Sequence, residues 1–350
     1  MRLAFLHGSN DVYGASRVLL EDCRILAASG HQIEVCLPCN GPLSALLKQA
    51  GATVTETPLH VLRLSDRRSL LRGPVRLPAW QAVPDVVILW TLALMAYLPV
   101  LRLRGLPLLV SVHELLPSRL GGLLAGTLRG TGGRVQVNSL AVADWLESCG
   151  VSRNHLHLAY PAAGPPVELT RTAAAGPRVG LLGRVNGSKG HLEAVRLVDL
   201  VRRRHGVDLR LTLAGGPFPG QERHLHALLQ RISDLDHVTY LGEVEDARVV
   251  LGDVDLLLVW SQKPESFGLT PLEAWSAGRR TVTNGAGGAT EAAWLVDGIV
   301  VPQDDPVEAA DALAWVLNQP RLLDPPSLNA PVSILATTAE RAACWRELLT

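Results

Sequence analysis

The chain has 350 residues, of which 47% are hydrophobic and 19% are charged, and its formal net charge is zero. This length allows two domains with substantial cores, and the balanced charge excludes the strongly basic character typical of nucleic-acid-binding proteins. The five cysteines are an odd number, and no secretory leader precedes the first predicted strand, so we expect free thiols and a cytoplasmic protein.

Strands and helices alternate along the first half of the chain. The apolar patterns predict strands at Leu3–Leu6, Gln32–Val35, Thr53–Thr57, Val86–Trp90, Leu108–Val112 and Val135–Val137, with helices at Ala15–Ser29 and Leu43–Ala50. This alternation is typical of a parallel sheet covered by helices on both faces. The apolar run 86–101 has about 16 residues, fewer than the ~20 of a membrane-spanning helix, so we expect a buried strand followed by a helix.

A segment rich in proline and glycine, 161–177, then interrupts the pattern and predicts an interdomain linker. Beyond it we expect strands at Arg178–Leu182, Leu209–Ala214, Val238–Leu241 and Asp255–Val259, and helices at Leu192–Arg204, Gln221–Ser233 and about Ile334–Leu348. The sequence therefore predicts an α/β protein of two similar domains, residues 1–165 and 177–325.

Two cations, Arg184 and Lys189, lie in the glycine-containing loop Gly183–Gly190 between a predicted strand and a helix. Glycines let the backbone approach a ligand closely, and preorganised cations stabilise the charge that develops on a departing diphosphate. The same pattern also fits a surface loop with two solvated charges.

Two acidic residues, Glu265 and Glu273, flank the start of another predicted helix. Thr270 is expected to be its N-cap and Pro271 its first helical residue, which places Glu273 in the first turn and Glu265 in the preceding loop. A helix N-terminus favours an anion such as a diphosphate. Thr270 and Glu273 also fit a capping box, in which Glu273 needs no ligand.

The segment Pro264–Glu291 resembles the E-x7-E signature of glycosyltransferase family 4, whose members retain the anomeric configuration and have two Rossmann-like domains (the GT-B architecture). The glycine pair and glutamate that follow this signature in the family correspond to the stretch Gly287–Glu291, and Gly183–Gly190 resembles the family's diphosphate clamp. The sequence departs from the family at Arg279-Arg280, because a proline is usual soon after the position of Gly278.

The resemblance implies two Rossmann-like domains facing across a cleft, with a C-terminal helix, about 331–350, that crosses back to an acceptor-side N-terminal domain. It implies transfer of a sugar from a nucleotide-diphosphate sugar to a hydroxyl acceptor, which is a glycan, a lipid-linked molecule or a small molecule. The departing phosphate would help to deprotonate that hydroxyl, and neither a metal nor a cofactor is expected. The implied catalytic residues are Glu265, His113, Arg184 and Lys189. The implied donor-binding residues are Gly14, Gly183, Arg184, Lys189, Glu265, Phe267, Gly268, Leu269 and Glu273.

Two of these residues lie in the first half of the chain. His113 lies at the tip of a predicted strand, where it could bind the donor sugar, assist the acceptor hydroxyl, or only complete the local structure. Gly14 matches a family loop that commonly has two glycines, of which this chain keeps one.

Other interpretations of the sequence remain open. A sugar-nucleotide epimerase of the same architecture and a non-catalytic partner subunit would share the fold. Asp253-x-Asp255 has the spacing of a metal-binding D-x-D motif, although it leads into a buried strand. The arginine-rich segment 62–80 could contact the inner face of a membrane peripherally, form a solvated loop, or bind an acceptor.

Overall fold

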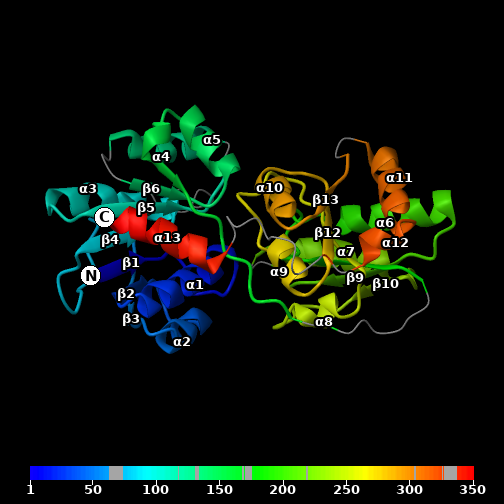
Figure 1. Cartoon of the computed structure of the whole chain (residues 1–350), viewed down its shortest axis with the longest axis horizontal. Helices are drawn as coiled ribbons and strands as arrows, with labels where there is room; N and C mark the ends of the chain where they lie inside the picture. The colour runs from blue at the N-terminus through cyan, green and yellow to red at the C-terminus, as the bar shows by residue number, and fades with distance from the viewer. Residues whose placement is uncertain are drawn as a thin grey trace. The chain divides into compact units, whose positions relative to one another are not determined.

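The computed structural model describes residues 1–62, 74–116, 118–130, 134–167, 169, 176–217, 220–302, 305–324, 326 and 337–350. The chain forms two compact units (Figure 1). Unit 1 is Met1–Ala162 together with Thr338–Thr350, and unit 2 is Ala163–Thr337.

The strands of unit 1 form a parallel sheet in the order β3-β2-β1-β4-β5-β6-β7. They are β1 (Arg2–Leu6), β2 (Gln32–Leu37), β3 (Thr53–Glu56), β4 (Val86–Leu89), β5 (Leu108–Val112), β6 (Arg134–Val137) and β7 (Leu156–Leu158). The helices are α1 (Gly14–Ala28), α2 (Pro42–Gln49), α3 (Leu98–Leu103), α4 (Arg119–Gly126), α5 (Leu140–Ser148) and α13 (Thr338–Leu349), with 3₁₀ turns η2 (Leu92–Tyr97), η3 (Thr127–Gly130) and η4 (Arg153–His155). The order of the strands in the sheet reverses at β1, which pairs with β2 on one side and with β4 on the other.

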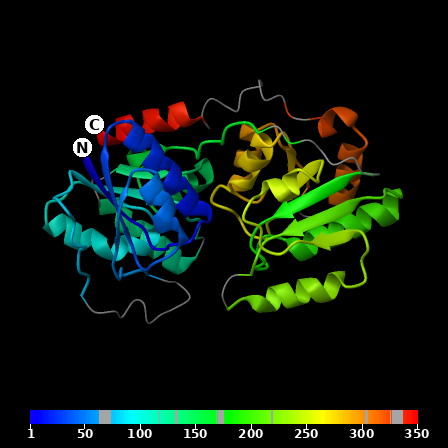
Figure 2. The ribbon, with the colours of Figure 1, turned by 90° about the horizontal axis from the view of Figure 1, so that it is seen from below.

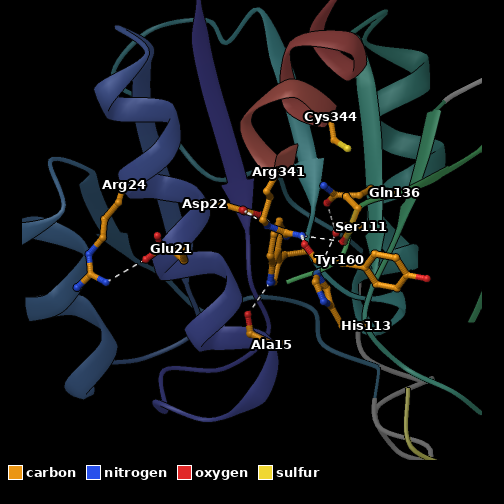
Figure 3. A network of polar contacts seen from close by, with 12 residues as sticks. Ala15, Glu21, Asp22, Arg24, Ser111, His113, Gln136, Tyr160, Arg341 and Cys344 are labelled. Atoms are coloured by element: carbon orange, nitrogen blue, oxygen red, sulfur yellow. Dashed lines mark hydrogen bonds and ion pairs between the residues drawn. The ribbon is translucent and has the colours of Figure 1, made fainter. Parts of the chain in front are cut away.

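The return of the C-terminal helix to the first domain is confirmed, because α13 belongs to unit 1 and contacts α1. The guanidinium of Arg341 forms a fully buried ion pair with Asp22 of α1 (Figure 3). It also donates to the carbonyl oxygens of Ala159 and Tyr160, at 2.7 and 2.8 Å. Burying two charges is favourable only when they are paired and hydrogen-bonded, and both conditions are met here.

Unit 2 has a parallel sheet in the order β10-β9-β8-β11-β12-β13. Its strands are β8 (Arg178–Leu182), β9 (Arg210–Ala214), β10 (Val238–Tyr240), β11 (Leu256–Val259), β12 (Arg280–Thr283) and β13 (Ile299–Val300). Its helices are α6 (His191–His205), α7 (Glu222–Ile232), α8 (Arg248–Leu251), α9 (Thr270–Ser276), α10 (Gly288–Leu295), α11 (Pro306–Leu317) and α12 (Pro320–Leu323), and they flank both faces of the sheet (Figure 2).

The predicted alternation of strands and helices is thus confirmed in both units. Buried apolar side chains such as Leu181, Val198 and Leu258 fill the main core of unit 2, between its sheet and the helices α6 and α11. The apolar run 86–101 forms β4, η2 and the start of α3, as expected. In the parts of the chain that are described, no helix has the length and apolar character needed to span a membrane. The arginine-rich segment 62–80, for which membrane contact was one of three alternatives, lies largely outside the described residues.

Candidate functional site

The loop between β8 and α6 contains the two predicted cations, and backbone contacts anchor it closely. Gly183 N donates to Ala214 O at 3.1 Å, and Val185 N donates to Gly216 O at 2.9 Å. Gly190 ends the loop with a φ of 73°, and a Cβ at this position would lie 1.8 Å from the carbonyl oxygen of Trp260. Only glycine combines this left-handed conformation with so close an approach.

Lys189 and Glu265 come together as an ion pair, with 2.8 Å between the lysine Nζ and the carboxylate Oε2. The Glu265 side chain is 12% exposed and that of Lys189 is 33% exposed, so the pair is shielded from water but can still be approached. The hydroxyl of the buried Ser261 donates to the other carboxylate oxygen, Oε1. Both oxygens of Glu265 are therefore held in fixed positions.

The backbone of Glu265 is tied to the loop that precedes α10. Its N–H donates to Ala286 O at 3.1 Å, and its carbonyl accepts from Gly288 N at 2.8 Å. Gly268 lies against the carboxylate with a φ of 86°, and a Cβ there would be 3.0 Å from Glu265 Oε2. The acid is thus positioned by two glycine-containing loops at the carboxyl edge of the unit 2 sheet, the edge where open α/β sheets bind ligands.

Glu273 lies in the first turn of α9, as predicted, but the expected N-cap is wrong. Leu269 already has helical dihedral angles (φ −82°, ψ −20°), so the helix begins at Thr270 and no side-chain cap forms. The capping box with Glu273 is therefore not observed, because Thr270 is itself helical.

The remaining predicted donor residues of unit 2 lie in the same two loops. Arg184 follows Gly183 directly and is partly exposed. Leu269 is partly buried, whereas the Phe267 side chain is 1% exposed and belongs to the protein interior. Any donor contact from Phe267 would therefore come from its backbone.

The Asp253-x-Asp255 motif and the Arg279-Arg280 pair of unit 2 both have structural partners. The Asp253 carboxylate pairs with the Arg178 guanidinium, and Asp255 accepts from Arg178 N at 2.8 Å. Among the described residues, no group of three or more His, Cys, Asp or Glu side chains could hold a metal ion. Arg279 and Arg280 are buried and bond mainly to backbone carbonyls; Arg279 Nε donates to Leu251 O, for example, at 2.8 Å. Hydrogen bonds thus satisfy both guanidinium groups at the point where the sequence departs from the family pattern.

In unit 1, His113 follows β5 and is 8% exposed. Its Nε2 lies 2.9 Å from Ser111 Oγ, and its ring is 4.5 Å from that of Trp90. Burial lowers the pKa of His113 well below its usual 6.5, and Arg341 and His7 lower it further, so the ring is neutral at physiological pH. Gly14 starts α1 with a φ of 30°, and a Cβ there would meet nothing within 4 Å.

Three well-placed polar residues were not among the predicted site residues. Ser261 orients Glu265, His191 lies buried at the start of α6, and His7 lies buried just after β1. Burial lowers the pKa of both histidines to about 4. The position of each histidine, directly after a strand or a glycine loop, is a signal in the sequence. Only the tertiary contacts distinguish these histidines from ordinary core residues.

Two family models match the sequence, one on each unit. The model for "Glycosyltransferase Family 4" matches residues 12–163, and the model for "Glycosyl transferases group 1" matches residues 176–319. No curated protein matches the sequence.

Several solved structures share the fold over the whole chain. HepE from Anabaena, in complex with UDP and glucose, has a TM-score of 0.77 at 19% identity, covering 100% of this chain and 99% of that chain. A glycosyltransferase from Rickettsia africae has a TM-score of 0.74 at 14% identity, covering 99% of this chain and 97% of that chain. Sucrose-phosphate synthase from Thermosynechococcus elongatus has a TM-score of 0.70 at 18% identity, covering 99% of this chain and 98% of that chain. The two matched models and the shared pair of Rossmann-like domains identify the chain as a glycosyltransferase of the GT-B type, with a family 4 N-terminal domain.

Proposed function

We propose that the chain is a retaining glycosyltransferase that moves a sugar from a UDP-sugar to a hydroxyl acceptor. The Lys189–Glu265 ion pair at the end of the glycine loop carries this proposal. HepE, which has the same fold, was crystallised with UDP and with UDP-glucose, which supports a uridine donor. The hydroxyl acceptor is a glycan, a lipid-linked molecule or a small molecule.

The proposed chemistry depends on the hydrogen-bonding capacity that the ion pair retains. An ammonium has three donors, so Lys189 can hold Glu265 and still donate to a diphosphate oxygen. A carboxylate has about four acceptor positions, so Glu265 can accept from Ser261, Lys189 and also a sugar hydroxyl. Arg184 and Lys189 would stabilise the charge on the leaving diphosphate, and Glu273 would accept from the ribose hydroxyls.

In the transfer step, the bond between the anomeric carbon and the diphosphate oxygen breaks, and the acceptor oxygen bonds to the same carbon. The departing phosphate oxygen takes the acceptor's proton, so the charges balance without a protein base. Attack from the face of the leaving group retains the anomeric configuration. NMR of the first sugar released from UDP-glucose, recorded before mutarotation, would test this step, and an inverted product would contradict it.

Ligand binding provides the first test of the donor assignment. A ligand at about 100 times its dissociation constant adds about 2.7 kcal/mol to the free energy of unfolding, enough for a clear rise in melting temperature. We expect UDP and UDP-glucose to raise the melting temperature of the wild type.

Turnover of two variants tests the diphosphate clamp. Loss of one preorganised cation typically lowers turnover by about 10²–10³, so Arg184→Ala and Lys189→Ala should each lower it by this factor. Near-normal turnover in both variants would refute the proposed diphosphate clamp.

A further inference from the structure

The chain contains three pairs of an asparagine followed by a glycine, namely Asn40-Gly41, Asn186-Gly187 and Asn284-Gly285. Such a pair is prone to deamidation, because no side chain hinders attack of the glycine nitrogen on the carbon of the asparagine amide. The second pair lies between Arg184 and Lys189, the two cations of the proposed diphosphate clamp. Its surroundings therefore decide whether this loop is chemically stable.

The contacts of the Asn186 side chain activate its amide carbon. Its Oδ1 accepts from Ser188 N at 3.0 Å and from Ser188 Oγ at 2.8 Å. Gln262 N donates in turn to Ser188 O at 2.7 Å, which fixes the position of both donors. Attack on the amide carbon places negative charge on Oδ1, and preorganised donors stabilise such a charge as it develops.

The same turn brings the attacking nitrogen to the carbon. A bond from the N–H two residues ahead to Oδ1 is an Asx turn, in which the side chain folds back over the intervening peptide. The amide carbon of Asn186 thus faces the nitrogen of Gly187, as in a near-attack conformer. Gly187 is exposed, and within the described residues its N–H makes no hydrogen bond. Its left-handed φ of 75° favours glycine, so the nitrogen stays unhindered.

The surroundings of Asn284 are the opposite in every respect. Its side chain is buried, and its Oδ1 has no hydrogen-bond partner among the described residues. Its Nδ2 donates to Ser261 O at 2.8 Å, which holds the nitrogen that would have to leave. Gly285 N donates to Thr283 Oγ1 at 3.2 Å, which occupies the nitrogen that would have to attack. The fold therefore protects this pair.

We propose that Asn186 is a site of deamidation that inactivates the diphosphate loop. The Gly187 nitrogen loses its proton and bonds to Cγ of Asn186, and the bond from Cγ to Nδ2 breaks. Ammonia leaves with that proton, and a cyclic imide remains. Water then opens the imide at either carbonyl and gives an aspartate, or an isoaspartate whose main chain runs through the former side chain. The reaction consumes one water for each ammonia released.

The effect on nucleotide binding rests on the proposed glycosyltransferase function. Both products carry a carboxylate between Arg184 and Lys189, where a diphosphate would bind, and like charges repel. The isoaspartate also lengthens the main chain of the loop, which displaces Lys189. We expect the affinity for UDP to fall at least about tenfold after conversion.

Mass-spectrometric peptide mapping tests the chemical part in the full-length protein without any ligand. The wild type is incubated in alkaline buffer, folded or unfolded in urea, and all three pairs are followed. In the folded protein Asn186 should convert at least about tenfold faster than Asn284, since one donor to a developing oxyanion contributes about 10²–10³. In urea the two rates should be similar. Protection of Asn186 in the folded protein to the same extent as Asn284 would overturn the inference.

Calorimetric titration with UDP, before and after the incubation, tests the effect on binding. Asn186→Ser keeps an oxygen for the turn but has no amide, so it should retain whatever affinity it has at the start. Asn40→Ser is the matched control, because it removes an exposed pair of unit 1 and should lose affinity as the wild type does. Asn186→Asp reproduces one product without incubation and should bind UDP at least about tenfold more weakly than the wild type.

Two outcomes of the titrations would overturn the inference. One is unchanged UDP affinity in wild type whose Asn186 has been converted. The other is an equal loss of affinity in the incubated wild type and the incubated Asn186→Ser variant. If the fresh wild type does not bind UDP, the proposed function itself fails, whereas the conversion of Asn186 is still measured by peptide mapping.

Discussion

Two glycines at the ends of α6 allow the close approach at the diphosphate loop to be tested against a matched control. Gly190 and Gly206 both have left-handed backbones, with φ values of 73° and 66°. A Cβ at position 190 would lie 1.8 Å from Trp260 O, whereas a Cβ at position 206 would meet nothing within 4 Å. Real Cβ atoms stay at least 3.0 Å from such neighbours, so Gly190→Ala requires a movement of more than an ångström.

The two variants share their backbone strain and differ only in this movement. An alanine in the left-handed region costs about 1–2 kcal/mol, and reduced freedom of the unfolded chain offsets about 0.4–1 kcal/mol. Gly206→Ala should therefore lower the free energy of unfolding by roughly 0–1.6 kcal/mol and leave the affinity for UDP within about threefold. Gly190→Ala should displace the adjacent Lys189, and a misplacement of about 1 Å can reduce kcat/KM about 10²-fold.

The assay is calorimetric titration with UDP, together with UDP release from UDP-glucose and urea unfolding of both variants. We expect weak UDP binding and slow turnover for Gly190→Ala only. Equal behaviour of the two variants would refute the reasoning, because the close contact with Trp260 would then have no functional effect.

Three further predictions concern the acids, the buried ion pair and a buried histidine. Glu273→Gln should weaken UDP binding, whereas Glu265→Gln should leave it unchanged and lower turnover; calorimetry giving the reverse would exchange the two roles. Asp22→Asn or Arg341→Met leaves a buried charge unpaired, which lowers the free energy of unfolding by about 3–5 kcal/mol. For a domain of this size, the melting temperature should then fall by about 6–20 °C. Scanning calorimetry showing a shift below about 2 °C would contradict this. Burial lowers the folded pKa of His191 to about 4. Its neutral form therefore contributes up to about 3 kcal/mol to the free energy of unfolding above pH 6.5. This contribution is lost as the pH falls from 6.5 toward 4. Urea unfolding should show a smaller loss between pH 7 and pH 5 for His191→Gln than for the wild type.

The positions of most strands were predictable because buried parallel strands appear in the sequence as short apolar runs. The strand Arg178–Leu182 was predicted with the bounds of β8, and the helix Leu192–Arg204 differs from α6 by one residue at each end. The strand β12 was not predicted, because it begins with the buried Arg280. The Asp297 carboxylate and backbone carbonyls compensate that charge, and these contacts are not visible in a sequence pattern.

The candidate site was predictable in its parts but not in its assembly. Lys189 and Glu265 were each identified from their own motif, whereas their ion pair joins two loops that are distant in the sequence. His7 was missed because its hydrogen-bond partners, Ser9 and Ser16, contact it only after the loop folds. Local propensity also misplaced the start of α9 by one residue, since Leu269 adopts helical angles in its tertiary context.

The buried pair of Asp22 and Arg341 has a consequence for synthesis of the protein. Asp22 lies in the first helix, whereas Arg341 is translated only after the whole of unit 2. While the ribosome adds unit 2, the nascent first domain has a carboxylate without its cation and an aromatic surface, Phe5 and Trp90, without Trp345. The first domain to emerge is therefore the last to be completed, and during that interval its uncovered apolar surface is prone to aggregation.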